Sequence, residues 1–485
     1  MTATTFPTPP DAVLATLESK VSPNKTLPLA EHLARYDLVP GLQLAVFHKG
    51  KIIWTKNYGV RAADSHPVIK VDDDTQFQAA SISKPVTAVA VLRLVEKGVL
   101  NLDVDVNDYL KRWKLPTATA TSGLKTTLRL LLSHRAGLNG DNFDGYARND
   151  PHLPDVVGVL NGDGNCPKTV IDSIPGYYRY SGAGYEIVQL VMEDVCGKPF
   201  AELMDDLVLT PAGMTRSTFR VCVDTPPSDN HALSHPFCDA TISGGYLVYP
   251  ESAAAGLWTT AVDLVKFALA IGRSVQPVLL TSGGVIYPPG SALLTTASAA
   301  EYITLAGGEH DPSTKHMALG IMRQGKADRM RLSHNGGNLG FISTFQLNPH
   351  SGFGFATLIN GQSSRRWDEI SAALEEIYEW PDVLPPAVDV GGSTLEKDDV
   401  QFDLLAGTYG SAAGGDVVVS KDGTCAFTLA EGPFALRRRV GTTTFGVDGF
   451  AETVLEFAMS NGMDQPAASV SIRSGFNSVE AKRRS

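Results

Sequence analysis

Short hydrophobic runs of strand length cluster at two places in the chain, near residue 50 and near residue 345. The first cluster is a pair of runs, at 41–48 and 52–60, on either side of a Lys-Gly-Lys turn at 49–51. Strand-like runs separated by so short a turn predict an antiparallel hairpin. The second cluster has runs at 329–335, 341–348 and 353–360, followed by an amphipathic helix over about 363–380. We expect both clusters to meet in one antiparallel sheet.

Helical patterns fill the sequence between these clusters. The run SISKPVTAVAVLRLVEK, residues 81–97, is apolar on nearly every face and stops at Gly98, as expected of a helix that passes through the centre of a domain. From about 125 to 275, helical runs alternate with loops rich in glycine and proline. The pattern therefore predicts a mainly helical section inserted into the sheet-forming part, with the start of the 81–97 helix opening into a cleft.

The sequence changes character after residue 380. The segment PDVLPPAVDVGGSTLEKDD is rich in proline, glycine and acidic residues, which is typical of a linker, and we place the linker at 386–398. The short alternating runs that follow predict a small antiparallel β-domain. Because 485 residues exceed what one hydrophobic core usually organises, the predicted division is a catalytic domain at 1–385, the linker, and the β-domain at 399–485.

Composition and charge narrow the class of partner. The chain is 43% hydrophobic and 19% charged, with 46 glycines and 29 prolines, as in an ordinary globular protein with many turns. A net charge of −11 without a sustained basic block argues against nucleic acid or an anionic membrane as the partner, and favours a small molecule. The start of the sequence lacks a secretion-signal pattern, and no apolar stretch is long enough to span a bilayer, so we expect a cytoplasmic location.

Cysteines and histidines give little indication of a metal or a disulfide framework. The five cysteines are odd in number and lack C-x-x-C spacing. His231, His235 and Cys238 form an H-x3-H-x2-C cluster, but Pro236 opposes the helix that would bring the histidines onto one face. We therefore predict neither a metal nor a cofactor.

A serine and a lysine at the start of the 81–97 helix are the strongest chemical signal. The pattern S-x-x-K occurs three times, at Ser22, Ser81 and Ser122, but only Ser81 opens an apolar helix, where Lys84 lies on the same face. A serine hydroxyl needs a neighbouring base before it can attack an acyl carbon. Partial burial would lower the pKa of the Lys84 ammonium and make it such a base. An isolated S-x-x-K is more often a helix cap with a solvated lysine, so the interpretation depends on other motifs.

Two further motifs accompany the first, and together they carry a family resemblance. Tyr180-Ser181-Gly182 precedes a strong helix, and His334-Asn335-Gly336-Gly337 ends a predicted strand. These three elements, in this order, resemble the serine β-lactamase and penicillin-binding-protein superfamily, nearest the class C β-lactamases and related esterases and D-aminopeptidases. Segments such as TLRLLLSHRAGL and AAAGLWTTAVDLVKF also resemble family stretches. The resemblance covers roughly residues 25 to 380.

The resemblance implies a fold and a set of roles. The fold class is α/β: an antiparallel sheet flanked by helices, a helical subdomain, and a C-terminal part similar to the lipocalin-like β-domains of some relatives. Ser81 would be the nucleophile, with Lys84 and Tyr180 sharing its proton and His334 on the facing wall. The family pattern also implies that the backbone N–H groups of Ser81 and Gly337 form an oxyanion hole, and that Gly182, Asn335 and Gly336 line the substrate site. His134, in LLSHRAGL, is interpreted as a structural hydrogen-bonding histidine.

Two departures from the β-lactamase pattern shape the expected activity. Gly182 stands where the tyrosine motif usually has asparagine, which removes an amide that would hold an acylamino side chain and brace the lysine. His334 replaces a permanently charged lysine with a group of ordinary pKa about 6.5, which weakens carboxylate anchoring. We therefore expect a serine hydrolase that acts through an acyl-enzyme on an ester or amide of a small molecule. An acyltransferase, an inactive binding or scaffold protein, and a D-aminopeptidase or true β-lactamase remain the alternatives.

Overall fold

The fold is known here from a computed structural model. It describes residues 9–21, 29, 33, 39–116, 124–140, 143–236, 241–279, 287–308, 316–362, 365–378 and 380. Farther along it describes the backbone of the strands between residues 407 and 483. The linker predicted at 386–398 and the boundaries at 385 and 399 lie outside these residues, so the division into domains stays a prediction.

The central element is a six-stranded antiparallel sheet with the order β2-β1-β10-β9-β8-β7. Strand β1 pairs with β10, with Leu42 opposite Ile359, so the two hydrophobic clusters of the sequence do meet in one sheet. The first hairpin turns through Lys49 and Gly50, both at positive φ, which suits a tight two-residue turn. The strands are β1 (Gly41–His48), β2 (Lys51–Gly59), β7 (Met322–Gln324), β8 (Arg331–Asn338), β9 (Phe341–Asn348) and β10 (Phe353–Ile359).

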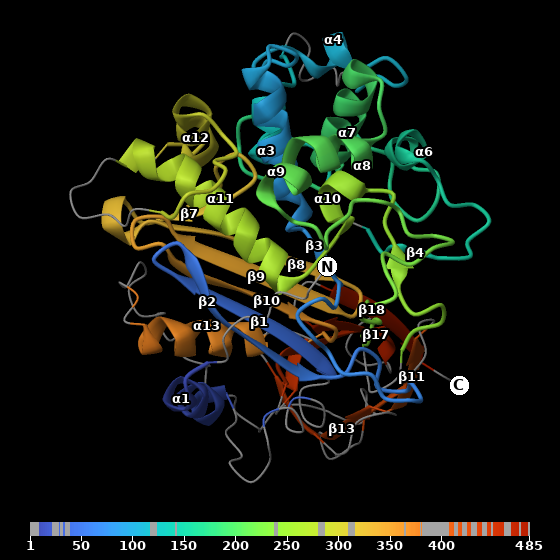
Figure 1. Cartoon of the computed structure of the whole chain (residues 1–485). Helices are drawn as coiled ribbons and strands as arrows, with labels where there is room; N and C mark the ends of the chain where they lie inside the picture. The colour runs from blue at the N-terminus through green and yellow to red at the C-terminus, as the bar shows by residue number, and fades with distance from the viewer. Residues whose placement is uncertain are drawn as a thin grey trace.

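Alternate residues of the sheet enter two separate hydrophobic cores. In β1, Leu44 and Val46 join a core with the helices α1 (Asp11–Val21) and α13 (Arg365–Ile377), whereas Phe47 joins the larger core on the opposite face. Figure 1 shows α1 and α13 on one side of the sheet and the long helix α11 (Ala261–Leu279) across the other. Helices therefore flank both faces of the sheet, as predicted.

The helical section lies beside the larger core, on the α11 side of the sheet (Figure 1). The buried helix α3 (Ser83–Glu96) begins two residues later than the sequence indicated, because Ser81 and Ile82 form a turn. The other elements are α4 (Val106–Tyr109), α5 (Leu128–Leu132), α6 (Val156–Asn161), α7 (Ala183–Cys196), α8 (Phe200–Met204), a π-helical turn (Asp205–Leu209), α9 (Thr210–Ala212), α10 (Ser252–Ala255) and α12 (Thr296–Ile303). Two short sheets pair β3 (Phe77–Ala80) with β6 (Leu257–Thr259) and β4 (Tyr146–Ala147) with β5 (Leu247–Val248).

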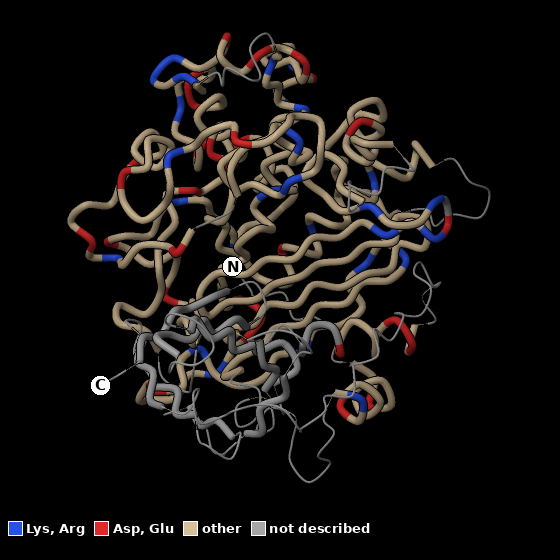
Figure 2. The backbone as a smooth tube through the Cα atoms, turned by 180° about the vertical axis from the view of Figure 1, so that it is seen from behind, with Lys and Arg blue, Asp and Glu red and all other residues tan. Residues whose placement is uncertain are grey.

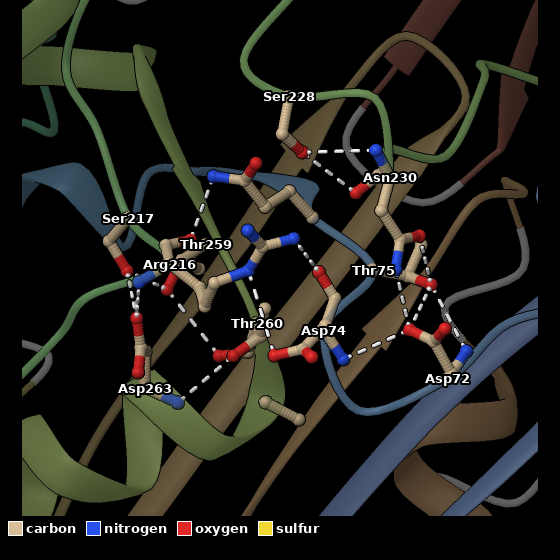
Figure 3. Close-up of polar contacts among 12 residues, drawn as sticks. Asp72, Asp74, Thr75, Arg216, Ser217, Ser228, Asn230, Thr259, Thr260 and Asp263 are labelled. Carbon is tan, nitrogen blue, oxygen red and sulfur yellow. Dashed lines mark hydrogen bonds and ion pairs between the residues drawn. The ribbon is translucent and has the colours of Figure 1, made fainter. Parts of the chain in front are cut away.

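A polar network anchors the segment that leads into β3 (Figure 3). The Thr75 hydroxyl bonds Asn230 at 2.8 Å, and the Arg216 guanidinium donates to the Asp74 carbonyl at 2.9 Å. On the far side of Arg216, its backbone N–H donates to Asp263 at 2.7 Å, next to the start of α11. These bonds join the segment before β3 to residues 216 and 230, and residue 216 to residue 263. They therefore help to position β3 and the Ser81 turn that follows it.

The C-terminal strands form a closed antiparallel barrel in the order β11 to β18, with β11 pairing back to β18. Such sequential closure is typical of up-and-down barrels, lipocalins among them. The sequence patterns indicated five of these strands and missed β11, β14 and β18. The strands are β11 (Gly407–Ser411), β12 (Asp416–Val419), β13 (Thr424–Phe427), β14 (Phe434–Arg438), β15 (Thr444–Val447), β16 (Phe450–Met459), β17 (Ala467–Ser474) and β18 (Asn477–Arg483).

Charged residues are scattered over the described chain, and the middle of the sheet is largely free of them (Figure 2). Blue and red segments both occur around the periphery, and several blue segments lie close together at one end of the sheet. Among the described helices, none is both long enough and apolar enough to cross a bilayer.

Candidate active site

Ser81 lies in a tight turn between β3 and α3. The preceding residue, Ala80, has φ = 47°, a left-handed conformation that costs a non-glycine residue energy and turns the chain sharply. The Lys84 backbone N–H donates to the Ser81 carbonyl at 3.0 Å and closes the turn. Ser81 is partly exposed, although its neighbours in α3 are buried. The other two S-x-x-K serines, Ser22 and Ser122, lie outside the described residues.

Lys84 is fully buried and its amino group lies beside the serine. Its Nζ donates to Ser81 Oγ at 3.0 Å and to the Ala254 carbonyl at 3.0 Å. The rings of Tyr180 and Tyr185 surround it, with centroids 4.9 and 5.8 Å from Nζ. A lysine buried among aromatic rings and one carbonyl lacks the hydration that a surface ammonium has, so this is no solvated first-turn lysine.

Tyr180 comes from the loop that leads into α7. Its ring centroid lies 6.5 Å from that of His334, so the tyrosine sits between the lysine and the facing strand. Gly182, the departure from the family pattern, is the buried N-cap residue of α7. The Ser181 hydroxyl donates to the Asn139 carbonyl at 2.6 Å and so is engaged by another loop.

Strand β8 forms the facing wall, and it differs from the sequence-based prediction in its length. The strand-like run in the sequence ended at Asn335, yet the strand continues through Asn338. A Cβ on Gly336 would lie 2.1 Å from the Ala79 carbonyl oxygen and 3.0 Å from the Ser81 nitrogen. Residue 336 must therefore be glycine, because β8 approaches the Ser81 turn too closely to leave room for a side chain.

The same strand has an open edge along the site. Strand β7 pairs only with residues 331–333 of β8, so among the described strands none pairs with the outer edge from His334 onward. Gly337 lies on this stretch and is partly exposed. The Asn335 side chain accepts a hydrogen bond from the Thr344 hydroxyl at 2.9 Å. Backbone groups of β8 thus border the site beside Ser81.

His334 is a buried, neutral imidazole. Its Nδ1 lies 2.6 Å from the Asn335 carbonyl, and since a carbonyl only accepts, Nδ1 carries the proton and Nε2 keeps a lone pair. Nε2 is buried without a hydrogen-bond partner. Burial, followed by the charge of Lys84, lowers the pKa of His334 from 6.5 to about 3. At neutral pH His334 is therefore a hydrogen-bond acceptor without positive charge.

Sequence reasoning missed two residues that hold the site together. The Ala254 carbonyl in α10 binds the lysine, and the Asn338 amide bridges from β8 to Gln78 Oε1 at 2.7 Å and to the Ala255 carbonyl at 3.2 Å. Backbone carbonyls carry no sequence signal. Asn338 does follow directly on the glycine motif, and a side-chain amide at that position could have indicated hydrogen bonds to neighbouring segments.

The histidine and cysteine cluster considered for a metal is engaged otherwise. His235 bonds the Asn360 carbonyl through Nδ1 at 3.0 Å and accepts the Ala63 N–H at Nε2 at 3.1 Å. His231 Nδ1 lies 2.6 Å from the Ser228 carbonyl, in extended chain instead of a helix. Cys238 lies outside the described residues. Over the part of the chain that the structure describes, no group of three or more metal-binding side chains occurs.

Comparisons with known proteins agree with the fold. The sequence profile of the Beta-lactamase family matches residues 29–378. Protein flp of Staphylococcus aureus is 23% identical over 340 residues, which cover 68% of this chain and 62% of flp, so the match spans less than two thirds of that relative.

Solved structures extend the likeness. The octameric penicillin-binding-protein homologue from Pyrococcus abyssi superposes with a TM-score of 0.57 at 18% identity, covering 96% of this chain and 99% of its own. A class C β-lactamase gives a TM-score of 0.54 at 15% identity, covering 77% of this chain and 98% of its own. The likeness to the first therefore extends over nearly the whole chain, whereas the second accounts for about three quarters of it.

Proposed function

Because the chain belongs to the Beta-lactamase family, we propose that it is a serine hydrolase that forms a covalent acyl-enzyme at Ser81 with an ester or amide of a small molecule. The observation that carries the proposal is the 3.0 Å contact between the fully buried Lys84 amine and Ser81 Oγ. It supplies a nucleophile and a base within direct proton-transfer distance, in a setting where the base is withdrawn from water.

Acylation proceeds by addition and elimination at the acyl carbon. Lys84, as the neutral amine, takes the Ser81 hydroxyl proton while Oγ bonds to the carbonyl carbon, and the carbonyl π-electrons move onto oxygen as the oxyanion. When the tetrahedral adduct collapses, the bond to the leaving group breaks, and the leaving alcohol or amine takes a proton that Lys84 passes through Tyr180. The position of the tyrosine ring, 4.9 Å from the lysine nitrogen, supports this relay.

Deacylation reverses the sequence with water. Water gives a proton to the same pair while its oxygen attacks the acyl carbon, and the adduct then releases the carboxylic acid and restores the Ser81 hydroxyl. The oxyanion of both adducts is assigned to the N–H groups of Ser81 and Gly337, which typically contribute about 3 to 4 kcal/mol per donor. The close packing of Gly336 against the Ser81 turn supports this assignment, because it brings the two backbones together.

The substrate class follows from the two departures in the motifs. A neutral His334 supplies no positive charge that would anchor a substrate carboxylate. Gly182 offers no amide side chain, and the Ala254 carbonyl takes over contact with the lysine. Both features favour esters and simple amides over penicillin-like substrates.

Active-site labelling tests the proposal. A fluorophosphonate probe should attach to Ser81, and peptide mapping by mass spectrometry should find the adduct there and lose it in Ser81→Ala. Nearby Ser83, a buried residue whose hydroxyl donates to the Ala80 carbonyl at 2.6 Å, is the matched control and should stay unlabelled. A folded protein that remains free of adduct after prolonged exposure would contradict the proposal.

Product analysis separates hydrolysis from its alternatives. The panel is a p-nitrophenyl ester, a simple amide, a D-amino-acid amide and a β-lactam, each with and without an added alcohol or amine. Free acid from the ester supports a hydrolase, whereas transfer product that rises with the acceptor concentration assigns an acyltransferase. Turnover confined to the D-amino-acid amide or the β-lactam would replace the ester and amide assignment.

We further propose a cytoplasmic protein whose partner is its small-molecule substrate, not nucleic acid or a membrane. The described cysteines Cys166, Cys196 and Cys222 are free thiols, which suits a reducing compartment. The net charge of −11, without a sustained basic block along the sequence, supports the small-molecule partner. Cell fractionation followed by immunoblotting tests the location.

A further inference from the structure

His134 contacts the segment that carries Tyr180 through both its backbone and its side chain. The residue follows α5 with φ = 57°, and its carbonyl accepts the Arg179 N–H at 2.8 Å. Its imidazole Nδ1 accepts the Ser181 N–H at 3.1 Å. Between these bonds the imidazole stacks on the Tyr180 ring, with centroids 4.2 Å apart and the planes inclined by 30°. The backbone on both sides of the tyrosine and the ring itself are therefore all tied to one residue.

Two more aromatic rings hold the imidazole in turn. The Tyr185 ring lies 5.4 Å from it, and the Tyr185 hydroxyl is fixed by donating to the Leu132 carbonyl at 2.9 Å. The Tyr178 ring meets it edge-on at 6.2 Å. His134 is buried, so the surrounding side chains restrict the orientation of its ring. A stacked ring in a rigid surround fixes its partner more narrowly than a single hydrogen bond does.

The hydrogen bond from Ser181 defines the protonation state of His134. Since Nδ1 accepts, the proton of the neutral ring is on Nε2. An imidazolium would carry a proton on Nδ1 and lose this bond. Burial, followed by the charge of Lys84, lowers the pKa of His134 well below its ordinary value, so the accepting form persists at neutral pH.

We propose that His134 is the positioning residue for Tyr180, holding the phenol beside Lys84 through the Ser181 N–H bond and the ring stack. The inference rests on the proposed function and extends it. The interpretation of His134 as a structural hydrogen-bonding histidine is confirmed by its bond to the Ser181 N–H, and the proposal adds that this bond and the ring stack position Tyr180. The backbone bond from Arg179 persists whatever side chain is present at 134.

A double-mutant cycle with Tyr180→Phe tests the proposal. His134→Ala should lower kcat for a p-nitrophenyl ester by about 30- to 100-fold with little change in KM, since a displacement of about 1 Å can cost that much. In the Tyr180→Phe background the same substitution should cost less than about threefold, because the hydroxyl to be positioned is already absent. Equal losses in both backgrounds overturn the proposal.

His134→Asn keeps the test independent of folding. Asparagine tolerates the left-handed conformation at this position and its amide oxygen can accept the Ser181 N–H, but it lacks the ring. The kcat of His134→Asn should be at least about threefold higher than that of His134→Ala. If both variants have the kcat of the wild type, His134 does not position the tyrosine.

Ser133→Ala is the matched control for stability. Ser133 is buried at the same helix end and its hydroxyl donates to the Arg129 carbonyl at 2.7 Å, without contact to the tyrosine. It should lower the melting temperature and leave kcat/KM unchanged. A loss of kcat in this control equal to that of His134→Ala would show that general loosening of α5 explains both, and would overturn the proposal.

Nitrogen NMR of protein labelled in histidine supplies a readout apart from activity. The His134 signals, assigned by their loss in His134→Asn, should show an unprotonated Nδ1 and a protonated Nε2 at pH 7. A protonated Nδ1 excludes the Ser181 bond and the proposal with it. The proposed function fails separately, through Ser81→Ala that retains turnover, so the two failures are distinguishable.

Discussion

The two walls of the site are built in different ways. The helix wall, comprising Ser81 and Lys84 with Ala254, is held by side-chain contacts of 3.0 Å and contains the buried lysine. The strand wall, residues 334–338 of β8, is held by close backbone packing of Gly336 against the Ala79 carbonyl and the Ser81 nitrogen, and by the hydrogen bonds of the Asn338 amide. In the proposed function, the helix wall thus contains the reacting side chains, whereas the strand wall sets the separation of the two backbones that border the site.

The walls also differ in charge, and one influences the other. Burial, followed by the charge of Lys84, lowers the pKa of His334, so the strand wall presents a neutral ring opposite the lysine. Substitutions on the helix wall should therefore remove chemistry and leave the fold intact. Substitutions on the strand wall should disturb the geometry or the dependence of stability on pH.

The largest expected effect is at the nucleophile. Ser81→Ala should lower kcat by about 10⁴-fold or more, because the acyl-enzyme cannot form, while the melting temperature stays close to that of the wild type. Steady-state kinetics on a p-nitrophenyl ester and differential scanning fluorimetry measure the two quantities. Ser83→Ala should do the reverse, since it removes buried hydrogen bonds to the Ala80 carbonyl and from the Leu257 N–H: stability falls by about 1 to 2 kcal/mol and labelling at Ser81 persists. A stable Ser81→Ala variant with wild-type turnover would contradict the assignment of the nucleophile to the helix wall.

Loss of the base should come next. Lys84→Met fills the buried space but accepts no proton, and kcat should fall by about 10³-fold. The rate of fluorophosphonate labelling at Ser81, followed by intact mass, should fall in parallel. The exposed Lys198, which pairs with Asp206 at 3.0 Å on the surface, is the control, and Lys198→Met should leave both rates unchanged. Unchanged labelling in Lys84→Met would assign the proton to another group.

The third expected effect is on the strand wall. Gly336→Ala places a Cβ 2.1 Å from a backbone oxygen and 2.5 Å from Ser343 Oγ, so β8 must move away from the Ser81 turn. Overpacking of this kind costs about 1 to 3 kcal/mol of stability, and the shift should lower kcat by about 10²-fold. Urea denaturation and ester kinetics measure these changes. Gly140→Ala is the control, since nothing lies within 4 Å of its added Cβ. Equal stability of the two variants would contradict the packing account.

Features that depend on neighbours in sequence were predictable from sequence. The hairpin at Lys49 and Gly50 was found because its turn is local, and the pairing of Ser81 with Lys84 was found because residues three apart share a helix face. The α3 boundary was misplaced by two residues because the left-handed Ala80 shifts the turn, and alanine carries no signal for that conformation.

Several features that depend on distant contacts were not predictable, although the meeting of the two strand clusters in one sheet was. The predicted strand stopped at residue 335, and the reason for Gly336 beyond it is a contact with Ala79, far away in the sequence. For the same reason the Ala254 carbonyl and the tethering of Tyr180 by His134 were missed. Three barrel strands were also missed, since runs such as GTYGS are short and rich in glycine and resemble turns.

The smallest expected effect concerns the charge difference between the walls, and it appears as a dependence of stability on pH. The pKa of His334 in the folded protein, about 3, lies below its ordinary value of 6.5. Between pH 6.5 and 3, His334 therefore binds a proton in the unfolded chain but not in the folded protein. This contribution to stability is complete above pH 6.5 and is lost as the pH falls toward 3, amounting to about 2 kcal/mol between pH 6.5 and 5.

His334→Gln should remove this contribution, so its free energy of unfolding should fall less steeply with acid than that of the wild type, by up to one proton's worth of slope. Urea denaturation followed by tryptophan fluorescence measures it, because all five tryptophans lie between residues 54 and 380 and report on this part of the chain. The exposed His152, replaced in the same way, is the control and should keep the wild-type slope. If the slopes of wild type and His334→Gln coincide between pH 5 and 6.5, His334 takes up a proton in the folded state, and the strand wall is then not neutral in this pH range.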